Sequence, residues 1–516
     1  MNKMSFSNKF ISDYRVLAFI SGLLFSLAVL HVIFILAWFC LVPLFIAIRR
    51  KSLREFWWIG IAFGAAIPFV TFIPMIKGII AFTGDGFFFG FLVFLASIVF
   101  SALYWAIFMF LLGCLRSLFS GSLFLGALAV SAAWSLIEFT LNLPLHGLPW
   151  FACHSGNALA ENLYAIQSAA FFGDHLLTFI MVMVNYLFSA FLLRSGKIKL
   201  LFPVAIVGVW LGLGAGLQML FMSENVLSEK PFKLAILSEN ISPEVKWDDQ
   251  NGNRLVGDFL ELNKIASAQN PDIILWSESA VPWTYAPDDD FIRELRKVSD
   301  PKKITHLIGI NTEYNGNKLF NSVYSIAPEN KNPVRYDKCT ALDFIEKPVS
   351  GMLFPFFNEN GSIVQEGKNA EPLQTSNGKA GVLICNESFL TGSAMRMAVK
   401  GAGFLVNPAN DGWFSETPAV RQHFFVARLR AVETRKDLAV NSNNGFSGLI
   451  EASGKIAMIK HSKEPWVETV TVSPNNKITF YTKYPFLWIL VCVTSLVVAA
   501  GFSLKTKNFL NKSAEY

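Results

Sequence analysis

The chain has 516 residues, of which 53% are hydrophobic and only 16% are charged. Soluble globular proteins are about 25% charged, so this composition excludes a disordered chain and argues against a wholly soluble one. The net charge of +6 comes from 44 Lys and Arg against 38 Asp and Glu, and it gives no sign of nucleic-acid binding.

A helix that crosses a membrane needs about 20 consecutive apolar residues. Seven apolar runs precede residue 222 and an eighth follows the central part of the chain, so we expect about eight membrane helices. The runs are 16–30, 31–48, 56–80, 87–112, 118–141, 175–193, 200–221 and 484–502. The first continues straight into the second without a small-residue cleavage site, which argues against a cleaved signal peptide.

Lys and Arg mark the cytoplasmic ends of membrane helices, and here they gather in every second loop. The clusters are 3–15, 49–54, 116, 194–199 and 505–512. With eight helices, both termini lie in the cytoplasm. We therefore expect a membrane domain of seven helices over 1–221 and an extracytoplasmic domain over 222–483. A C-terminal helix with a short cytoplasmic tail follows over 484–516.

The central part alternates short apolar runs with amphipathic segments, which is typical of an α/β sandwich with helices covering its sheets. The expected strands are 233–237, 273–276, 305–310, 322–326, 381–384, 404–406 and 439–441. The expected helices are 254–268, 392–400 and 419–436.

The six cysteines are widely spaced and form no CxxC pair, which argues against a zinc site and a disulfide framework. Cys385 is distinctive because it ends an apolar strand and polar residues follow at once. Thiols at the carboxyl edge of a sheet are candidates for nucleophiles. The alternative is a buried, inert cysteine.

Two further residue types suit the chemistry of a thiol nucleophile. Glu278 lies just after the apolar run Ile273–Trp276, separated from it by Ser277, where partial desolvation would raise its pKa toward that of a general base. Lys338 by itself is typical of a surface lysine, and Glu278 alone of a solvated strand end. Together with Cys385 they supply a nucleophile, a base and an ammonium for an oxyanion.

A series of motifs in the central domain is similar to a known family. They are Asn407-Pro-Ala-Asn-Asp-Gly-Trp413, Gln422-His423, Ala427-Arg-Leu-Arg-Ala431, Asn443-Asn-Gly445 and Gly454-Lys455. The domain resembles the nitrilase (carbon-nitrogen hydrolase) superfamily, whose members use a Glu-Lys-Cys triad. The whole chain resembles the apolipoprotein N-acyltransferases, which are bacterial inner-membrane enzymes.

The resemblance implies a four-layer αββα sandwich joined to a membrane domain of about eight helices. It assigns catalysis to Glu278, Lys338 and Cys385. Supporting positions at the active site are Trp247, Glu346, Asn386 and Glu387. Trp247 and the aromatic segment 352–357 are candidates for lining a lipid entrance, with core packing as the alternative for the segment. Trp413 and His423 are expected to be structural.

Three stretches depart from the family pattern. After the lysine the family reads Leu-Val-Pro-Phe-Gly-Glu, whereas this chain reads Ala341-Leu-Asp-Phe-Ile-Glu346, with Asp343 and Ile345 replacing Pro and Gly. The residue after the nucleophile is usually Tyr and here is Asn386. The usual Gln-Gly-Asn near the start of the domain is Ser238-Glu-Asn240.

The resemblance implies a two-step acyl transfer without metal or soluble cofactor. An acyl chain would pass from a phospholipid to the Cys385 thiol, and then to the α-amino group of the N-terminal S-diacylglyceryl-cysteine of an apolipoprotein. The enzyme would be a monomer in the inner membrane, with its catalytic domain on the periplasmic side. One alternative is a membrane-anchored nitrilase-type amidase acting on a small amide. Another is a catalytically silent binding protein, against which the intact triad counts.

Overall fold

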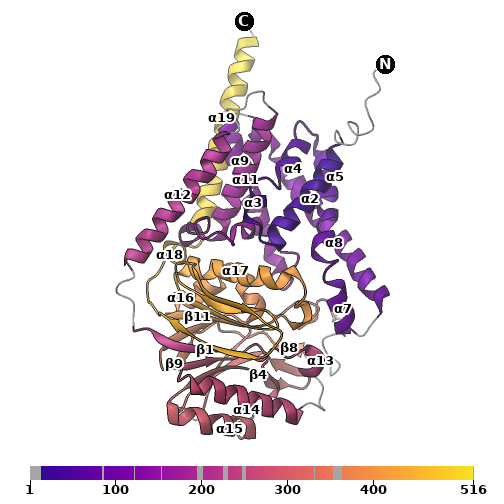
Figure 1. Ribbon diagram of the computed structural model, residues 1–516. Coiled ribbons are helices and arrows are strands. Elements are labelled where there is room, and N and C mark those ends of the chain that lie inside the picture. Colours follow the sequence, from indigo (N-terminus) through magenta and orange to yellow (C-terminus); the bar gives the residue numbers. More distant parts are fainter. Residues whose placement is uncertain are drawn as a thin grey trace.

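The computed structural model describes residues 13–83, 86–120, 122–152, 154–193, 201–224, 230–246, 252–330, 332–351 and 363–514. A bundle of apolar helices occupies one end of the molecule and an α/β domain the other (Figure 1). Helix α17 (Pro418–Thr434) lies between the two parts.

Within the described residues, five helices are long and apolar enough to cross a membrane. They are Leu53–Thr71, Phe87–Cys114, Leu123–Leu145, Asp174–Leu192 and Leu201–Met222. Three shorter apolar helices, Tyr14–Leu30, Phe34–Ala47 and Leu487–Ser503, coincide with the remaining three predicted runs. A helical membrane domain is therefore confirmed, and the count of eight spans stays a prediction.

Two of the predicted spans are not continuous helices. The run 31–48 forms α3 (Phe34–Ala37) and α4 (Val42–Ala47), and α4 has a proline, Pro43, in its first turn. The run 56–80 divides into α5 (Leu53–Ala66), α6 (Pro68–Thr71) and α7 (Ile76–Thr83). A proline cannot donate the backbone hydrogen bond that continues a helix, so Pro68 and Pro74 coincide with the breaks.

The remaining helices of the membrane part are continuous or very short. They are α2 (Tyr14–Leu30), α8 (Phe87–Cys114), α9 (Leu123–Asn142), α10 (Ala169–Phe172), α11 (Asp174–Leu192), α12 (Leu201–Glu224), α18 (Phe480–Lys483) and α19 (Leu487–Ala514), with 3-10 turns η1 (Arg116–Ser120), η2 (Leu143–Leu145) and η3 (Ser155–Leu159).

Two sheets build the α/β domain. In the described part, the first has nine strands, with β1, β2 and β4 in parallel at its centre and β15 antiparallel along β1. Its strands are β1 (Phe232–Ser238), β2 (Ile273–Leu275), β3 (Val281–Thr284), β4 (Thr305–Asn315), β5 (Lys318–Phe320), β6 (Ser322–Ile326), β7 (Val334–Asp337), β8 (Ile363–Val364) and β15 (Trp466–Val472).

The second sheet has six strands in the order β14-β13-β12-β11-β10-β9. They are β9 (Leu373–Thr375), β10 (Gly378–Val382), β11 (Phe404–Asn410), β12 (Leu438–Asn443), β13 (Phe446–Ile450) and β14 (Ile456–His461). The sheets face each other: Phe232 of β1 meets Phe404 of β11 with ring centres 5.0 Å apart. Asn441 of β12 also donates to the carbonyl oxygens of Leu237 and Leu275.

Helices cover both outer faces of this pair of sheets. The helices α14 (Gly252–Ala268) and α15 (Asp290–Ser299) cover the first sheet, and α16 (Ser393–Val399) and α17 cover the second (Figure 1). The predicted four-layer αββα sandwich is therefore confirmed. All seven predicted strands and three predicted helices correspond to elements of the structure. Helix α15 and the antiparallel strands β13 to β15 were not expected from the sequence.

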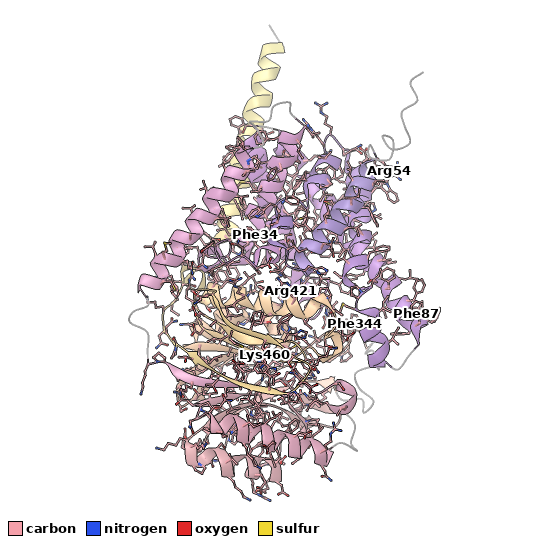
Figure 2. The ribbon with its side chains drawn as sticks, in the orientation of Figure 1. Phe34, Arg54, Phe87, Phe344, Arg421 and Lys460 are labelled. Carbon is pink, nitrogen blue, oxygen red and sulfur yellow. The ribbon has the colours of Figure 1, made fainter. Side chains whose placement is uncertain are left out.

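Helix α17 is covered on both sides, which its sequence does not suggest. Its apolar spacing predicts an amphipathic helix with a solvated face, yet Arg428, Arg430 and Glu433 are also buried. The membrane domain lies over the face that would otherwise meet water. Arg428 donates to the carbonyl oxygens of Ala160 and Glu161, at 3.0 and 2.6 Å. Figure 2 places Arg421 at the same junction.

A buried ion pair joins the two domains at the other end of α17. The Arg430 guanidinium donates to Asp174 at the start of α11 (3.0 Å) and to Glu433 (2.8 Å), and all three side chains are at most 2% exposed. The Asp174 backbone N–H also donates to Glu433. Arg430 therefore shares its single positive charge between two carboxylates that would otherwise be buried side by side.

Replacing Arg430 should destabilise the junction. In Arg430→Met the two buried carboxylates lose their shared cation, and breaking a buried pair in this way costs about 3–5 kcal/mol. We expect thermal unfolding of the detergent-solubilised protein, followed by tryptophan fluorescence, to shift to a clearly lower temperature. Lys463→Ala removes an exposed pair with Glu416 and should leave the midpoint unchanged. Equal midpoints for the two variants would contradict the assignment.

Candidate active site

The three predicted catalytic residues lie on loops that follow strands of both sheets. Glu278 follows β2, Lys338 directly follows β7, and Cys385 begins the 3-10 turn η9 (Cys385–Phe389) after β10. The Cys385 backbone has φ of +48°, in the left-handed region that non-glycine residues rarely adopt. The backbone N–H of Glu278 donates across to the carbonyl of Ala409 in the second sheet. The fold thus brings together strand ends that are far apart in sequence.

The Lys338 ammonium is shared by two carboxylates. It lies 3.1 Å from Glu278 Oε1 and 2.9 Å from Glu346 Oε1, and its side chain is 1% exposed. Burial alone would lower the pKa of Lys338, but the charges of Glu278 and Glu346 outweigh it and hold the pKa above its ordinary value. Lys338 is therefore a fixed cation, and Glu346 keeps the place that the resemblance gave it.

Asn321 completes this cluster and was not expected from the sequence. Its side-chain amide donates to Glu278 Oε1 at 2.8 Å. Its backbone carbonyl oxygen accepts the Lys338 backbone N–H at 2.9 Å. Asn321 stands between the short strand β5, which was not predicted, and the predicted strand 322–326. Its position beside β7 becomes evident only once the antiparallel pairing of β6 and β7 is known.

The Cys385 thiol is held as a neutral group at rest. Burial raises its pKa well above the ordinary value, and the negative charge of Glu278 raises it further. Lys338 acts in the opposite direction without reversing the shift. A thiol of this kind becomes a strong nucleophile only when a base removes its proton during attack. Among the neighbouring charges, that of Glu278 has the largest effect on the pKa of this thiol.

Glu387 links the turn that begins at Cys385 to the loop that follows Lys338. Its Oε1 accepts the backbone N–H groups of Cys339 (2.7 Å) and Thr340 (3.2 Å), and its Oε2 accepts that of Ile384 (2.8 Å). The Tyr336 hydroxyl donates to both oxygens. Burial raises the pKa of Glu387 to about 7 against these hydrogen bonds. Its role is to hold Cys385 and Lys338 in register.

The departures from the family pattern are accommodated around this core. Asn386 is buried, and its side-chain amide donates to the carbonyl of Thr340 at 3.1 Å, which adds a second link between the two loops. Glu239 is also buried and accepts the backbone N–H of Ser277, next to Glu278. Asp343 packs against Gly147 of the membrane domain, where a side chain would overlap its carboxylate.

Of the remaining candidate positions, some lie at the site and others lie outside the described residues. Trp247 and the aromatic segment 352–357 lie outside the described residues. His423, expected to be structural, contacts the nucleophile: its Nε2 lies 3.1 Å from the Cys385 carbonyl oxygen. Lys246 is buried and reaches the carbonyl of Glu278 at 3.4 Å.

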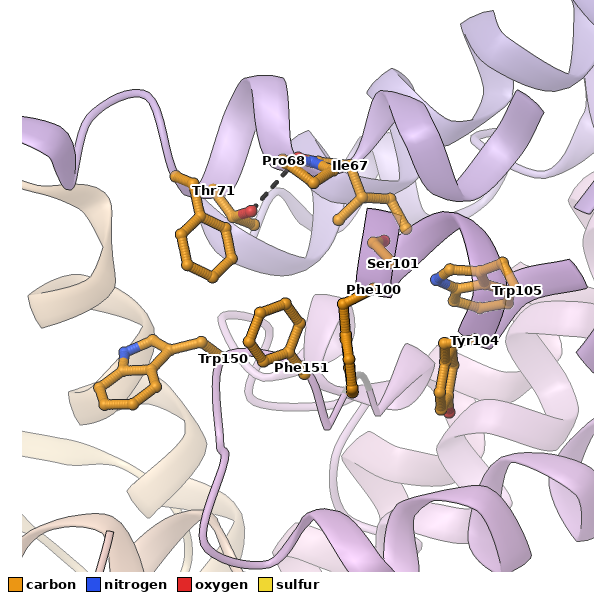
Figure 3. Close-up of a pocket in the computed structure, with 10 residues that line it drawn as sticks. Ile67, Pro68, Thr71, Phe100, Ser101, Tyr104, Trp105, Trp150 and Phe151 are labelled. Carbon is orange, nitrogen blue, oxygen red and sulfur yellow. Dashed lines mark hydrogen bonds between the residues drawn. The ribbon is translucent and has the colours of Figure 1, made fainter. Parts of the chain in front are cut away.

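A small cavity lies between membrane helices rather than at this site. Figure 3 shows its lining, which comes from α6 and the residues next to it, from α8 and from the loop at Trp150 and Phe151. Its volume is about 10 Å³, the room for roughly one water. Trp150 also packs on Phe414 of the α/β domain, with ring centres 5.7 Å apart. Across the described residues, no group of three or more His, Cys, Asp or Glu side chains is arranged to hold a metal ion.

Comparison with known proteins matches both parts of the chain. Residues 233–479 match the carbon-nitrogen hydrolase family model. Residues 21–187 match the N-terminal domain model of apolipoprotein N-acyltransferase. Relatives of that name from Geobacter metallireducens and Agrobacterium fabrum are each 26% identical to it. The alignments cover 73% of this chain and 74% of the first relative, and 72% of this chain and 72% of the second.

The chain belongs to the apolipoprotein N-acyltransferase family. It is therefore an acyltransferase with a carbon-nitrogen hydrolase domain. Among solved structures, it is similar to a carbon-nitrogen hydrolase from Helicobacter pylori, with 14% identity and a TM-score of 0.36, covering 47% of this chain and 89% of that one. An amidase from Nesterenkonia also has 14% identity and a TM-score of 0.36, over 49% of this chain and 95% of that one.

Replacing Glu387 by glutamine should impair this acyltransferase although the shape is kept. Both carboxylate oxygens face backbone donors, so either orientation of the amide turns an NH₂ group toward an N–H. We expect Glu387→Gln to lose about 1–3 kcal/mol of stability and most of its acyl transfer. Tyr336→Phe removes one hydroxyl donor and leaves the backbone donors paired, so it should lose less. A Glu387→Gln variant as stable and active as the native protein would contradict this role.

Proposed function

We propose that this protein N-acylates apolipoproteins through a thioester on Cys385, with a phospholipid as acyl donor. The observation that carries the proposal is the buried Glu278–Lys338 pair at 3.1 Å, whose two charges both act on the neighbouring thiol. The family supports lipoprotein N-acylation as the overall reaction. The thioester and the phospholipid donor are our assignment.

In the first step, Glu278 takes the thiol proton as sulfur attacks the carbonyl carbon of an acyl ester. The C=O electron pair moves to oxygen, and the Lys338 ammonium stabilises the oxyanion. The intermediate collapses by breaking the ester C–O bond, and protonated Glu278 gives its proton to the leaving alkoxide. A lysophospholipid departs and an acyl thioester remains on Cys385.

In the second step, the free α-amine of an S-diacylglyceryl-cysteine attacks the thioester. Glu278 accepts the amine proton, the C–S bond breaks, and the proton returns to the sulfur. The products are an N-acylated lipoprotein and the free enzyme. No redox partner enters either half, because bonds are exchanged without a change of oxidation state.

The placement of the α/β domain suits substrates that carry acyl chains. Helix α17 contacts the second sheet on one side and the membrane bundle on the other, which keeps the strand ends close to the bilayer. The basic residue Arg54 lies at the end of the bundle farthest from the sheets (Figure 2). Under the rule that basic ends are cytoplasmic, this supports a periplasmic catalytic domain in the inner membrane.

The roles within the triad can be separated by step. Cys385→Ala should form no acyl-enzyme with a labelled phospholipid, because no nucleophile remains. Glu278→Gln keeps the shape but removes the base, so acylation should collapse. Lys338→Ala removes an oxyanion donor worth about 10²–10³ in rate. Lys338→Arg should rescue little, since a planar guanidinium does not fit a site built for a point charge.

Acyl-enzyme is measured by mass spectrometry of the Cys385 peptide, and product by a lipidated acceptor peptide. Lys318→Ala, at the exposed start of β5, serves as the control and should match the native protein. Normal product formation by Cys385→Ala would show that the thiol is not the nucleophile. Release of acyl chains from a small amide but not from phospholipid would favour the amidase alternative.

Orientation can be tested with a cysteine introduced at either end of the molecule, with labelling read on the peptide that carries it. Lys318→Cys and Arg54→Cys are both exposed, on the α/β domain and at the far end of the bundle. In a Cys114→Ala background, a membrane-impermeant maleimide should label position 318 in spheroplasts, and position 54 only after lysis. Labelling of position 54 in intact spheroplasts would overturn the proposed topology.

A further inference from the structure

Three side-chain donors form hydrogen bonds with the backbone carbonyl oxygen of Cys385. Cys385 O accepts from Ser388 Oγ at 3.0 Å, from His423 Nε2 at 3.1 Å and from Asn407 Nδ2 at 3.3 Å. None of these groups belongs to the Glu-Lys-Cys set. A carbonyl has two lone pairs, so three donors saturate it. These hydrogen bonds therefore fix the turn at Cys385 on the side that faces helix α17.

His423 is the member of this trio that can carry charge. Its other ring nitrogen, Nδ1, lies 2.9 and 3.2 Å from the two carboxylate oxygens of Asp411. Asp411 is itself fixed by the Ser442 hydroxyl at 2.7 Å, and His423 stacks on Phe389. The whole arrangement is buried, with His423 5% and Asp411 8% exposed.

The surroundings of the imidazole favour its doubly protonated form. Nδ1 faces the Asp411 carboxylate. Nε2 faces the Cys385 carbonyl oxygen and, at 3.0 Å, the hydroxyl oxygen of Ser388, whose proton is donated to the Cys385 carbonyl. A neutral ring would set a nitrogen lone pair against one of these oxygens, whereas an imidazolium donates from both nitrogens. Burial alone would lower the pKa of His423, but the Asp411 carboxylate outweighs it and raises the pKa above the ordinary value.

An imidazolium that donates to the Cys385 carbonyl oxygen also affects the Asn386 N–H, which is on the opposite side of the same peptide unit. No cis peptide occurs in the described chain, so the Asn386 N–H points away from the Cys385 C=O. That N–H has no acceptor among the hydrogen bonds of the described residues. Charge-assisted donation to a carbonyl polarises the peptide, and hydrogen bonds in such chains strengthen one another. The N–H becomes a better donor to an oxyanion.

We propose that Asp411 and His423 form a charged positioning pair that polarises the Cys385–Asn386 peptide, making the Asn386 N–H the second oxyanion donor beside Lys338. The inference rests on the proposed function in one respect, that Cys385 attacks an acyl carbonyl. No bond to His423 is made or broken. The pair acts through the peptide and touches neither the acyl group nor the thiol sulfur.

The test compares two reactions of the same thiol. Acylation by p-nitrophenyl butyrate passes through an oxyanion, whereas alkylation by iodoacetamide is a displacement at a saturated carbon and does not. Both are followed on the Cys385 peptide by mass spectrometry in the full-length, detergent-solubilised protein. We expect Asp411→Asn, which keeps the shape but removes the charge, to slow acylation by about tenfold, a part of what one whole oxyanion donor supplies. Alkylation should change by less than about twofold. His423→Gln should behave alike, and the double variant should be no worse than the poorer single one.

Asp437→Asn is the matched control, since Asp437 is also a buried aspartate, held by the backbone N–H groups of Ala452 and Ser473 away from the triad. It should leave the ratio of acylation to alkylation unchanged. Equal losses of both reactions in Asp411→Asn and His423→Gln would assign the pair to folding or to the thiol and overturn the proposal. Unchanged acylation in both variants would overturn it as well. If the native protein acylates Cys385 from the activated ester but not from phospholipid, the proposed donor fails while this inference stands.

Discussion

The structure depends on a helix that is buried on both sides. Helix α17 packs its inner face on the second sheet, while its arginines hold the membrane domain through Glu161, Asp174 and the carbonyls around them. Charged groups can be buried there only because each meets a partner of opposite charge or a carbonyl. The same helix carries His423 to the nucleophile. The geometry of the thiol and the attachment of the domain to the bilayer are thus set by one rigid element.

The catalytic cluster solves a related electrostatic problem. A lone buried ammonium would be costly, and so would two carboxylates beside each other. Lys338 between Glu278 and Glu346 leaves a net negative charge, which the Asn321 amide partly offsets. The cluster thereby fixes the Glu278 carboxylate through the Lys338 ammonium and the Asn321 amide, near a thiol whose pKa burial raises.

Sequence patterns were sufficient to predict residues at the ends of apolar strands, because parallel strands present those ends at one edge. Glu278 and Cys385 were found in this way, whereas Lys338 needed the family resemblance. Asn321 was not singled out, and Asp411 appeared only within a motif and without a role, since their contacts come from strand pairing and from the helix packed above them. The same holds for α17, where a periodic apolar face predicted water on the side that the membrane domain covers. Pro68 and Pro74 coincide with the helix breaks, which the length of the apolar run alone does not predict.

The first and last strands of the α/β domain are neighbours, with Phe232 paired to Val472 and Ser238 to Trp466. Strand β1 therefore has an unpaired edge until β15 has been synthesised. Contacts so distant along the chain make folding slow. An exposed edge during that interval is also a site for pairing with other chains. We conclude that the α/β domain closes only when nearly all of it has been synthesised, so the last helix α19 follows a domain that has only just closed.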